Sequence, residues 1–520
     1  MSAGRGWLDR VRVHSPDREA FVFDGGSIAY GQLVRAVRIV ARELGRSGLE
    51  SGDLIAVLAP PTAAGVLLIH AAFEAGVAML PLNIRLSERE LRDAMIRTGV
   101  RFLFVEASMD PALAMRLSES APYGLVVFSE SKSGPEGAPG FAFELRRAPE
   151  GEDRASLARA RRDRRSRWVA LVLQTSGTSG RAKAAQLGLD NLIASAEASS
   201  ELLGRSAHDR WLLCMPLFHV GGLSILVRSA LDGVSFVLHR RFDAKQVAAA
   251  IDDEGVTRIS VVPTMLERLL EARGSRRAPD ALSLVLVGGG PASSALLTRA
   301  RALGYPIAPT YGLTEAASQV ATRPPGAGPA DGVDSGGGLE PLPGVEIRIV
   351  DGRGRPLPPG REGGIEVAGP IVMKGYLGDP EATARTLVGR WLRTGDIGML
   401  DRRGRLRVLD RRADLILSGG ENIYPAEIES VLAGHPAVAE CGVIGRPDPV
   451  FGARPIAFVV LLPGKSFDPA GFEAFCRERM AGYKVPDAFI EIADLPRTAS
   501  GKLARRRLRD QLGVGSRSRA

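Results

Sequence analysis

A run of small, hydroxyl-bearing and basic residues follows the apolar segment WVALVLQ (168–174) and could bind an anion. It consists of Thr175, Ser176, Gly177, Thr178, Ser179, Gly180, Arg181, Ala182 and Lys183. Glycines let backbone N–H groups approach an anion closely, hydroxyls donate further hydrogen bonds, and the lysine adds a counter-charge for a polyphosphate. The spacing does not fit the GxxxxGK[ST] phosphate loop. From these residues alone, a Ser/Gly turn between two strands is the alternative.

Seven further short segments that could carry chemistry follow in order. They are PLFH (216–219), GGGP (288–291), YGLTE (311–315), TGD (394–396), DRR (410–412), SGGENIYPAEIE (418–429) and SGK (500–502). With the loop at 175–183, this ordered set resembles the adenylate-forming superfamily of acyl-CoA synthetases, luciferases and peptide-synthetase adenylation domains. The resemblance extends from about residue 20 to residue 508. It implies an acid–thiol ligase that uses ATP, Mg²⁺ and coenzyme A.

The resemblance implies a nucleotide site built from most of these segments. Its residues are Thr175, Ser176, Gly177, Ser179, Gly180, Lys183, Gly289, Gly290, Pro291, Tyr311, Gly312, Thr314, Asp396 and Arg411, with Gly419 and Gly420 in a loop presented to coenzyme A. Tyr311 offers a flat face for adenine, and Asp396 matches the family carboxylate that binds the ribose hydroxyls. Without the resemblance, Asp396 would be interpreted as a turn former and Arg411 as a solvated charge.

By the same resemblance, Lys502, Glu315, Thr178 and His219 are the catalytic residues, and Glu315 and Thr178 hold the metal. A carboxylate suits Mg²⁺, which usually binds one or two carboxylates plus phosphate oxygens, although composition alone would place Glu315 at the surface. The chain has only seven lysines among 68 basic residues. At Lys502 a slim ammonium could enter a closed site and neutralise charge developing between a carboxylate and the α-phosphate. The alternative is one more charge in a basic tail.

The resemblance also implies a reaction in two steps. After the lysine matching Lys502 has acted in adenylation, the C-terminal domain of the family rotates about the segment near Arg411 and presents another face to coenzyme A. Many relatives have Asp or Lys at the hinge, where this chain has Ala413 followed by Asp414. The sequence therefore leaves Arg412, Asp414 or simple backbone freedom open as the hinge.

Four stretches look most similar to the o-succinylbenzoate–CoA ligases of menaquinone biosynthesis. They are PLFHVGGLSILVRSALDG, ISVVPTMLERLL, YGLTEAASQVAT and DRRADLILSGGENIYPAEIE. The acid of those ligases is a keto-dicarboxylate, so its site must hold a second anion. Arg228 is the candidate because it follows an apolar stretch in which a charge is costly unless paired; a surface helix turn is the alternative. His219 and Gly312 complete the predicted acyl site, although a packed core histidine would fit the same pattern.

The elements that must position these residues alternate between short apolar runs and amphipathic stretches. This pattern predicts layered α/β structure up to about residue 324, with 131–167 as a surface connection and 159–167 as its solvated basic part. Short strands separated by Gly/Pro turns then predict a β-rich subdomain. We expect an α/β multidomain protein, with residues 1–410 as an N-terminal adenylation domain and residues 411–520 as a small mobile α+β domain.

Composition excludes several other classes. The cysteines Cys214, Cys441 and Cys476 form no CxxC pair, and no apolar run is long and uncharged enough for a membrane span. The formal charge is +9, but aromatic residues are not interleaved with the basic ones. We therefore predict a cytoplasmic enzyme with small-molecule substrates and no nucleic-acid partner, and leave a homo-oligomer open. The alternatives are a synthetase for a fatty or aryl acid and, from another class, a basic nucleic-acid-binding protein.

Overall fold

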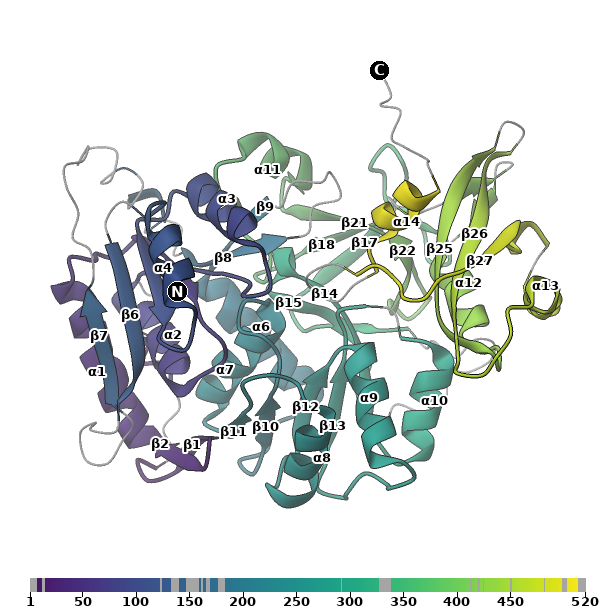
Figure 1. Cartoon of the computed structure of the whole chain (residues 1–520). Helices are drawn as coiled ribbons and strands as arrows, with labels where there is room; N and C mark the ends of the chain where they lie inside the picture. Colours follow the sequence, from purple (N-terminus) through teal and green to yellow (C-terminus); the bar gives the residue numbers. More distant parts are fainter. Residues whose placement is uncertain are drawn as a thin grey trace.

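Four β-sheets and the helices between them make up the computed structural model of this chain (Figure 1). The structure describes residues 7–11, 15–121, 124–131, 140–145, 159, 162–164, 169–175, 183–290, 292–326, 338–411, 414, 416–418, 421–423, 425–448, 451–480, 482–497 and 503–512.

The first large sheet has nine strands in the order β16, β15, β14, β13, β12, β10, β11, β1, β2. They are β1 (Glu19–Phe23), β2 (Gly26–Ala29), β10 (Arg210–Leu213), β11 (Ser235–Leu238), β12 (Arg258–Val261), β13 (Leu284–Val287), β14 (Ile307–Leu313), β15 (Ser318–Thr322) and β16 (Glu340–Pro341). The strands from β14 to β1 pair in parallel, and β2, β15 and β16 pair antiparallel at the edges. The first hairpin of the chain therefore joins a sheet whose other strands begin almost two hundred residues later.

The second large sheet has eight strands in the order β19, β9, β8, β4, β3, β5, β6, β7. They are β3 (Leu54–Leu58), β4 (Ala78–Pro81), β5 (Phe102–Glu106), β6 (Gly124–Ser131), β7 (Gly140–Leu145), β8 (Val169–Thr175), β9 (Lys183–Gly188) and β19 (Gly375–Tyr376). The prediction of a surface connection over 131–167 is wrong for β7, which pairs antiparallel with β6 at the sheet edge. It is also wrong for Arg164, which is buried and donates a hydrogen bond to the Gly52 carbonyl.

Helices lie between and outside the two large sheets. The helices between the two sheets are α1 (Tyr30–Arg46), α2 (Ala63–Ala75), α6 (Leu189–Leu203) and α7 (Val220–Asp232). The outer face of the eight-stranded sheet is covered by α3 (Glu88–Thr98) and α4 (Pro111–Ser118). The outer face of the nine-stranded sheet is covered by α8 (Ala244–Asp253), α9 (Pro263–Arg273) and α10 (Ser294–Ala302). Successive residues of a strand point to opposite faces, so Leu284 and Leu286 join the inner core while Val285 and Val287 join the outer one. The predicted layered α/β fold is confirmed.

The most apolar stretch of the sequence, 54–82, contains the buried helix α2. Thr62 begins it by accepting a hydrogen bond from the Gly65 N–H, and Gly76 ends it with a left-handed φ of 67°. Residues 63–73 are all buried against neighbouring elements. No helix in the described part of the chain is long and apolar enough to cross a membrane.

Two smaller sheets complete the fold. The first contains β17 (Glu346–Val350), β18 (Gly363–Ala368), β20 (Leu387–Val388), β21 (Trp391–Leu400) and β22 (Leu406–Arg411), with α11 (Pro380–Thr386) beside it. The second contains β23 (Ile416–Ser418), β24 (Glu421–Ile423), β25 (Val438–Asp448), β26 (Gly452–Leu461) and β27 (Ala488–Glu491), with α12 (Pro425–Leu432), α13 (Pro469–Arg477) and α14 (Arg505–Gln511). Short 3₁₀ turns are η2 (Thr314–Ala316) and η3 (Gly482–Lys484). The second sheet and its helices have hydrophobic clusters of their own and lie at the right of Figure 1.

A buried histidine anchors the N-terminal segment to α2. The Trp7 indole N–H donates a hydrogen bond of 2.9 Å to Nδ1 of His70, and the two rings stack with centroids 5.7 Å apart. Burial lowers the pKa of His70 to about 4, because the charged imidazolium loses its hydration. Nδ1 must also stay unprotonated to accept from Trp7.

We predict that the free energy of unfolding falls as the pH drops below 6.5. His70 takes up a proton near pH 6.5 in the unfolded chain but only near pH 4 in the folded chain. Its contribution to the free energy of unfolding is therefore fully present above pH 6.5 and decreases by about 1 kcal/mol per pH unit between pH 6.5 and pH 4. Denaturant titrations at several pH values measure this slope. His70→Gln, which keeps an acceptor that does not titrate, should flatten it, whereas the exposed control His208→Gln should not.

Candidate active site

The hairpin β14–β15 carries four predicted site residues, Tyr311, Gly312, Thr314 and Glu315, and its strands approach too closely at position 312 for any residue but glycine. Gly312 lies opposite Gln319 in the pairing, and a Cβ on Gly312 would lie 1.7 Å from the Ser318 carbonyl oxygen. Ala317 and Ser318 have positive φ angles of 51° and 107°, which are strained for residues other than glycine. The turn places Tyr311, Gly312 and Glu315 within one short segment.

Tyr311 and Asp396 come together although 85 residues separate them in sequence. The Tyr311 hydroxyl donates a hydrogen bond of 2.6 Å to Oδ2 of Asp396. Asp396 is buried in β21, with only 6% of its surface exposed, and it lies opposite Arg411 of β22 in the strand pairing. The backbone N–H of Asp396 donates to the Thr394 hydroxyl. The alternative interpretation of Asp396 as a turn former is therefore wrong, because the residue lies within β21.

The glycines at the end of β13 lie beside this hairpin. A Cβ on Gly288 would lie 2.6 Å from Cγ2 of Thr310, so the end of β13 packs tightly against β14. Gly289 has a φ of 79°, and among the described residues no heavy atom beyond the chain neighbours lies within 4 Å of a Cβ built on Gly290. The backbone next to the Tyr311 strand is therefore uncovered by side chains at Gly290. Pro291 lies outside the described residues.

Glu315 lies in η2 and is held by a tyrosine that our sequence analysis missed. The Tyr376 hydroxyl donates a hydrogen bond of 2.9 Å to Oε1 of Glu315, and Nζ of Lys183 lies 4.9 Å from the centre of the Tyr376 ring. Burial, followed by the negative charge of Glu315, raises the pKa of Tyr376, so its hydroxyl stays a donor. The strand β19 brings Tyr376 here by pairing with β9 opposite Ala185.

The predicted phosphate loop starts and ends on paired strands. Thr175 at the end of β8 lies opposite Lys183 at the start of β9, and the Thr175 hydroxyl donates to the Lys183 carbonyl over 3.4 Å. The predicted loop residues Ser176, Gly177, Thr178, Ser179 and Gly180 lie outside the described residues, as do Gly419, Gly420 and Lys502, and of Arg411 only the backbone is described.

His219 directly precedes the helix α7 as its N-cap residue; it is partly buried and contacts the Phe218 ring with centroids 4.7 Å apart. A Cβ on Gly222 would lie 2.5 Å from the Pro216 carbonyl, so this glycine lets the helix start pack against the preceding loop. Most of α7 is buried, but Gly221 and Ser224 are partly exposed. Arg228 continues that face at helical spacing.

Arg228 is buried, with 2% of its surface exposed, so the surface-turn alternative is wrong. Its Nη2 donates a hydrogen bond of 3.0 Å to Oε1 of Gln319, and its guanidinium lies 4.7 Å from the centre of the Trp211 ring. Among the described residues, Nε and Nη1 have no hydrogen-bond partner. Burial lowers the pKa of Arg228 to about 10, so the group is still a cation near neutral pH. A buried cation with two unused donors is costly unless an anion joins it.

A polar stripe on α6, made of Asn191, Ser195 and Ser199, was also missed. Asn191 donates to the carbonyls of Pro370 and Val372 at 2.7 and 2.9 Å. Ser195 donates to the Ala317 carbonyl and Ser199 to Oε1 of Gln319, at 2.8 and 2.7 Å. The sequence contained a signal for this stripe, because polar residues spaced four apart lie on one face of a helix. In a mostly buried helix such residues need hydrogen-bond partners inside the protein.

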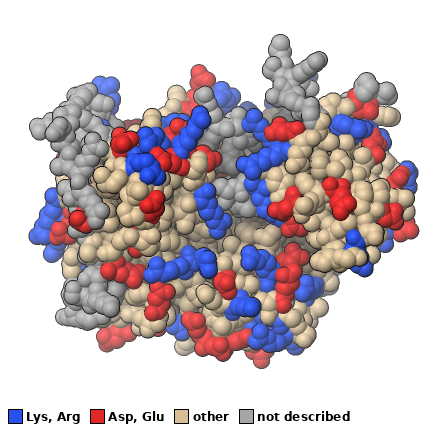
Figure 2. All heavy atoms as spheres, viewed as in Figure 1, with Lys and Arg blue, Asp and Glu red and all other residues tan. Residues whose placement is uncertain are grey.

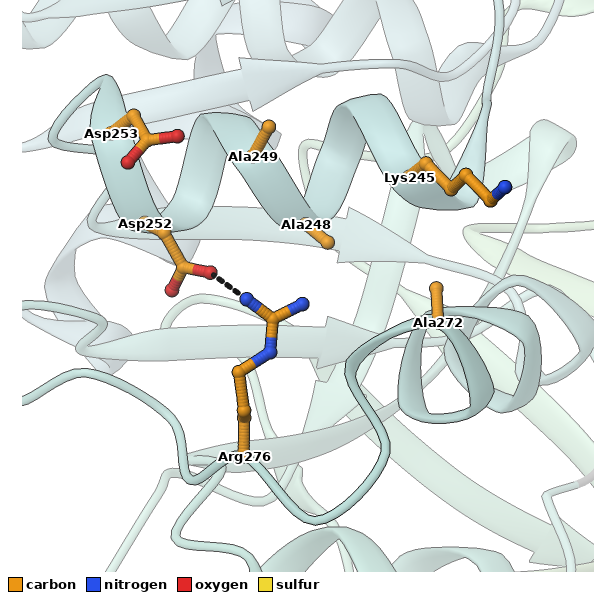
Figure 3. A pocket seen from close by; sticks show the side chains of 7 residues that line it. All are labelled: Lys245, Ala248, Ala249, Asp252, Asp253, Ala272 and Arg276. Carbon is orange, nitrogen blue, oxygen red and sulfur yellow. Dashed lines mark hydrogen bonds and ion pairs between the residues drawn. The ribbon is translucent and has the colours of Figure 1, made fainter.

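Surface features away from these residues do not suggest another site. A cavity of about 360 Å³ between α8 and α9 is lined by Lys245, Asp252, Asp253, Arg276 and three alanines (Figure 3). Arg276 and Asp252 form an ion pair across it, and it contains none of the predicted site residues. Figure 2 shows positive and negative side chains interspersed over the face in view rather than one continuous basic surface.

Comparisons with known proteins agree with this geometry. Residues 8–377 match the family model "AMP-binding enzyme", and residues 427–502 match "AMP-binding enzyme C-terminal domain". The chain therefore belongs to the AMP-binding enzyme family. Its relatives include the 2-succinylbenzoate–CoA ligase of Bacillus velezensis, which is 39% identical over 519 residues and 97% of each chain.

Similar solved structures belong to the same family, and their TM-scores indicate which liganded form of the relative this structure resembles more. The o-succinylbenzoate CoA synthetase of Bacillus subtilis in complex with its acyl-adenylate intermediate has a TM-score of 0.81, at 35% identity and 100% coverage of both chains. Its complex with ATP and magnesium ion also scores 0.81, at 36% identity and coverages of 97% and 99%. A double mutant bound to a CoA product analogue scores 0.65, at 36% identity and coverages of 97% and 98%. Since identity and coverage hardly differ, the described arrangement is closer to the ATP- and adenylate-bound forms.

We predict that Tyr376→Phe weakens the use of Mg-ATP while leaving the fold intact. The change removes only the hydroxyl that orients the Glu315 carboxylate, and a hydrogen bond to a charged group stabilises by roughly 1.5 to 3 kcal/mol. The magnesium concentration giving half-maximal activity should rise about tenfold. The exposed control Tyr483→Phe should leave it unchanged. An unaltered magnesium dependence in Tyr376→Phe would remove this tyrosine from the site.

Proposed function

We infer that this chain is an AMP-forming acid–CoA ligase that acts on 2-succinylbenzoate. In the first half-reaction the acid attacks the α-phosphate of ATP and gives an acyl adenylate and pyrophosphate. In the second, the thiol of coenzyme A displaces AMP and gives the thioester. Membership in the AMP-binding family and full-length similarity to 2-succinylbenzoate–CoA ligases support this function. The observation that carries the choice of a dicarboxylic acid is the buried guanidinium of Arg228 with two unused donors.

The residues gathered around the β14–β15 hairpin form the proposed ATP site. Tyr311 would lie against adenine on one side, with the backbone of Gly289 and Gly290 on the other, and Asp396 would accept hydrogen bonds from the ribose. Lys183 would bind phosphate. We assign the same site to Thr175, Ser176, Gly177, Ser179, Gly180, Pro291, Gly312, Thr314 and Arg411, and the coenzyme A side to Gly419 and Gly420.

Glu315 and Thr178 are the proposed metal ligands. A single carboxylate with phosphate oxygens is a donor set that Mg²⁺ prefers, and the hydrogen bond from Tyr376 orients the Glu315 carboxylate before any ligand binds. When bound, the ion would neutralise phosphate charge. The chain itself holds the carboxylate in place and supplies the ammonium of Lys183 nearby. Because the groups are positioned in advance, little reorganisation is needed during reaction.

We propose that residues 1–410 form the adenylation domain and residues 411–520 a mobile C-terminal domain. Asp414 is held by Nη1 of Arg505 at 3.4 Å and by Nη2 of Arg509 at 3.1 Å, both on α14. Since these contacts tie Asp414 to the C-terminal unit, the proposed pivot lies before it, within 411–413. Lys502 lies outside the described residues; the next residue in the sequence, Leu503, pairs with Arg497 within the same unit.

Lys502→Ala should slow acyl-adenylate formation by about a hundred- to a thousandfold and leave thioester formation from pre-made adenylate largely intact. The ammonium is proposed to stabilise charge that develops only in the first transition state, so its removal slows only that step. Pyrophosphate release and thioester formation are measured separately. Lys465→Ala, the same change at an exposed position of the C-terminal unit, is the control. Equal loss in both half-reactions would argue against this role.

The acyl site is proposed to lie along α7, between His219 at its start and Arg228 near its end. The partly exposed residues Gly221 and Ser224 line the same face, and we assign Gly312 to the same acyl site. Nε and Nη1 of Arg228 have no partner among the described residues, and the N–H of Nη2 that Gln319 does not use can form a pair of parallel donors with one of them, which suits a carboxylate. A fatty acid would bring only methylene groups to this cation, so a second carboxylate on the acid is favoured.

Arg228→Ala should raise the KM for 2-succinylbenzoate about ten- to a hundredfold, because one charged contact in a closed pocket contributes roughly 1.5 to 3 kcal/mol. Benzoylpropionate, which keeps the succinyl carboxylate and lacks the one on the ring, should be affected much less. Arg228→Lys should rescue only in part, since an ammonium does not reproduce the guanidinium fork. The control is Arg205→Ala, a more exposed arginine near the end of α7. If the wild type prefers fatty or other aryl acids, the substrate assignment fails and the broader ligase function stands.

A further inference from the structure

Gln319 uses both ends of its side-chain amide inside the protein. It lies on β15 with 2% of its surface exposed. Oε1 accepts from the Ser199 hydroxyl at 2.7 Å and from Nη2 of Arg228 at 3.0 Å. Nε2 donates to the hydroxyls of Thr322 at 2.9 Å and Thr310 at 3.4 Å. The residue therefore joins α6, α7, β14 and β15 at one buried point.

The two threonines determine which way the amide faces. Thr310 and Thr322 share a hydrogen bond of 2.7 Å, and the Thr310 hydroxyl also reaches the Ala321 carbonyl at 3.2 Å. If Thr322 donates to Thr310 and Thr310 donates to this carbonyl, both hydroxyl oxygens are left as acceptors for Nε2 of Gln319. The carbonyl end of the amide must then point to Arg228.

The contact with Gln319 and the ring of Trp211 together orient the guanidinium. Trp211 lies against the guanidinium of Arg228, and Arg258 lies 5.9 Å from the same ring. Oε1 of Gln319 accepts a hydrogen bond from one N–H of Nη2 of Arg228. The carboxylate of Asp232 accepts from Ser200 and Arg205. Gln319 is neutral, so it orients the cation without neutralising it, whereas a carboxylate at this position would form a buried ion pair.

We propose that Gln319 is a positioning residue that holds Arg228 with its unused N–H donors presented to the second carboxylate of the acid, and so sets the preference for a dicarboxylic substrate. This inference rests on the proposed function. It assigns to β15 a role in choosing the acid, in addition to the role of the neighbouring β14 in the nucleotide site. Because Gln319 lies opposite Gly312 in the strand pairing, the same hairpin connects the two sites.

The test compares Gln319→Met with Ser199→Ala. Methionine fills a similar volume but accepts no comparable hydrogen bond, so Arg228 loses its polar partner. Ser199→Ala removes the other donor to the same Oε1 and leaves the Arg228 contact in place. Steady-state rates with 2-succinylbenzoate and with benzoylpropionate give kcat/KM for each acid. The ratio of kcat/KM for 2-succinylbenzoate to kcat/KM for benzoylpropionate should fall about tenfold or more in Gln319→Met, because the KM for 2-succinylbenzoate rises while kcat stays the same. In Ser199→Ala this ratio should be nearly unchanged.

A purely structural role would have a different outcome. If Gln319→Met lowers kcat/KM for both acids equally, or raises the KM for ATP in parallel, the proposal is overturned. Gln319→Glu, which is nearly isosteric, carries the test should the Met variant lose thermal stability. The carboxylate of Gln319→Glu should pair with Arg228 and lower the preference for 2-succinylbenzoate over benzoylpropionate more than Gln319→Met does. If Gln319→Glu keeps the wild-type preference, the proposal is also overturned. If instead the wild type shows no preference for the dicarboxylate and Arg228→Ala changes nothing, the substrate assignment itself has failed.

Discussion

The buried polar side chains of α6 are the constraint on which the candidate site depends. A polar group shielded from water must find a partner or destabilise the fold. The partner of Asn191 is a carbonyl in the segment before β19, and the partner of Ser195 is a carbonyl in the strained turn after Glu315. The partner of Ser199 is the side-chain amide of Gln319. One rigid helix therefore sets the relative positions of segments more than a hundred residues away, and these segments carry Tyr376, Glu315 and the contact to Arg228.

Two charged groups in this site differ in how they are compensated. Glu315 already has a donor in Tyr376, with the Lys183 ammonium beside it, so a carboxylate destined for a cation is oriented in advance. Arg228 has a neutral acceptor and an aromatic ring but leaves two donors unused. The first arrangement favours binding of a metal–phosphate group. The second favours an anion that arrives with the substrate, because its binding relieves the cost of a buried cation.

Charged residues of the C-terminal unit lie close enough to α9 to act on the carboxyl group of Glu267. Burial and the neighbouring carboxylates of Glu271 and Glu440 raise the pKa of Glu267 on α9, and the positive charge of Arg497 opposes them. Within the unit, Arg505 binds Glu429 at 2.6 Å and also contacts Asp414. These contacts tie Asp414 and Glu429 to α14 within the C-terminal unit.

The amino-acid sequence by itself determined the family, the order of the motifs and most elements. The helices α12 and α13, for example, each begin at a proline and have amphipathic periodicity, and both of these are local signals. It could not show β7, the Tyr376–Glu315 contact or the Gln319 network, and it left Arg228 undecided between surface and interior. These depend on contacts between distant segments: whether a side chain is buried, and beside which partner, is set by the packing of α6 and α7 between two sheets. Local sequence carries no record of that packing, so only the tertiary structure decided it.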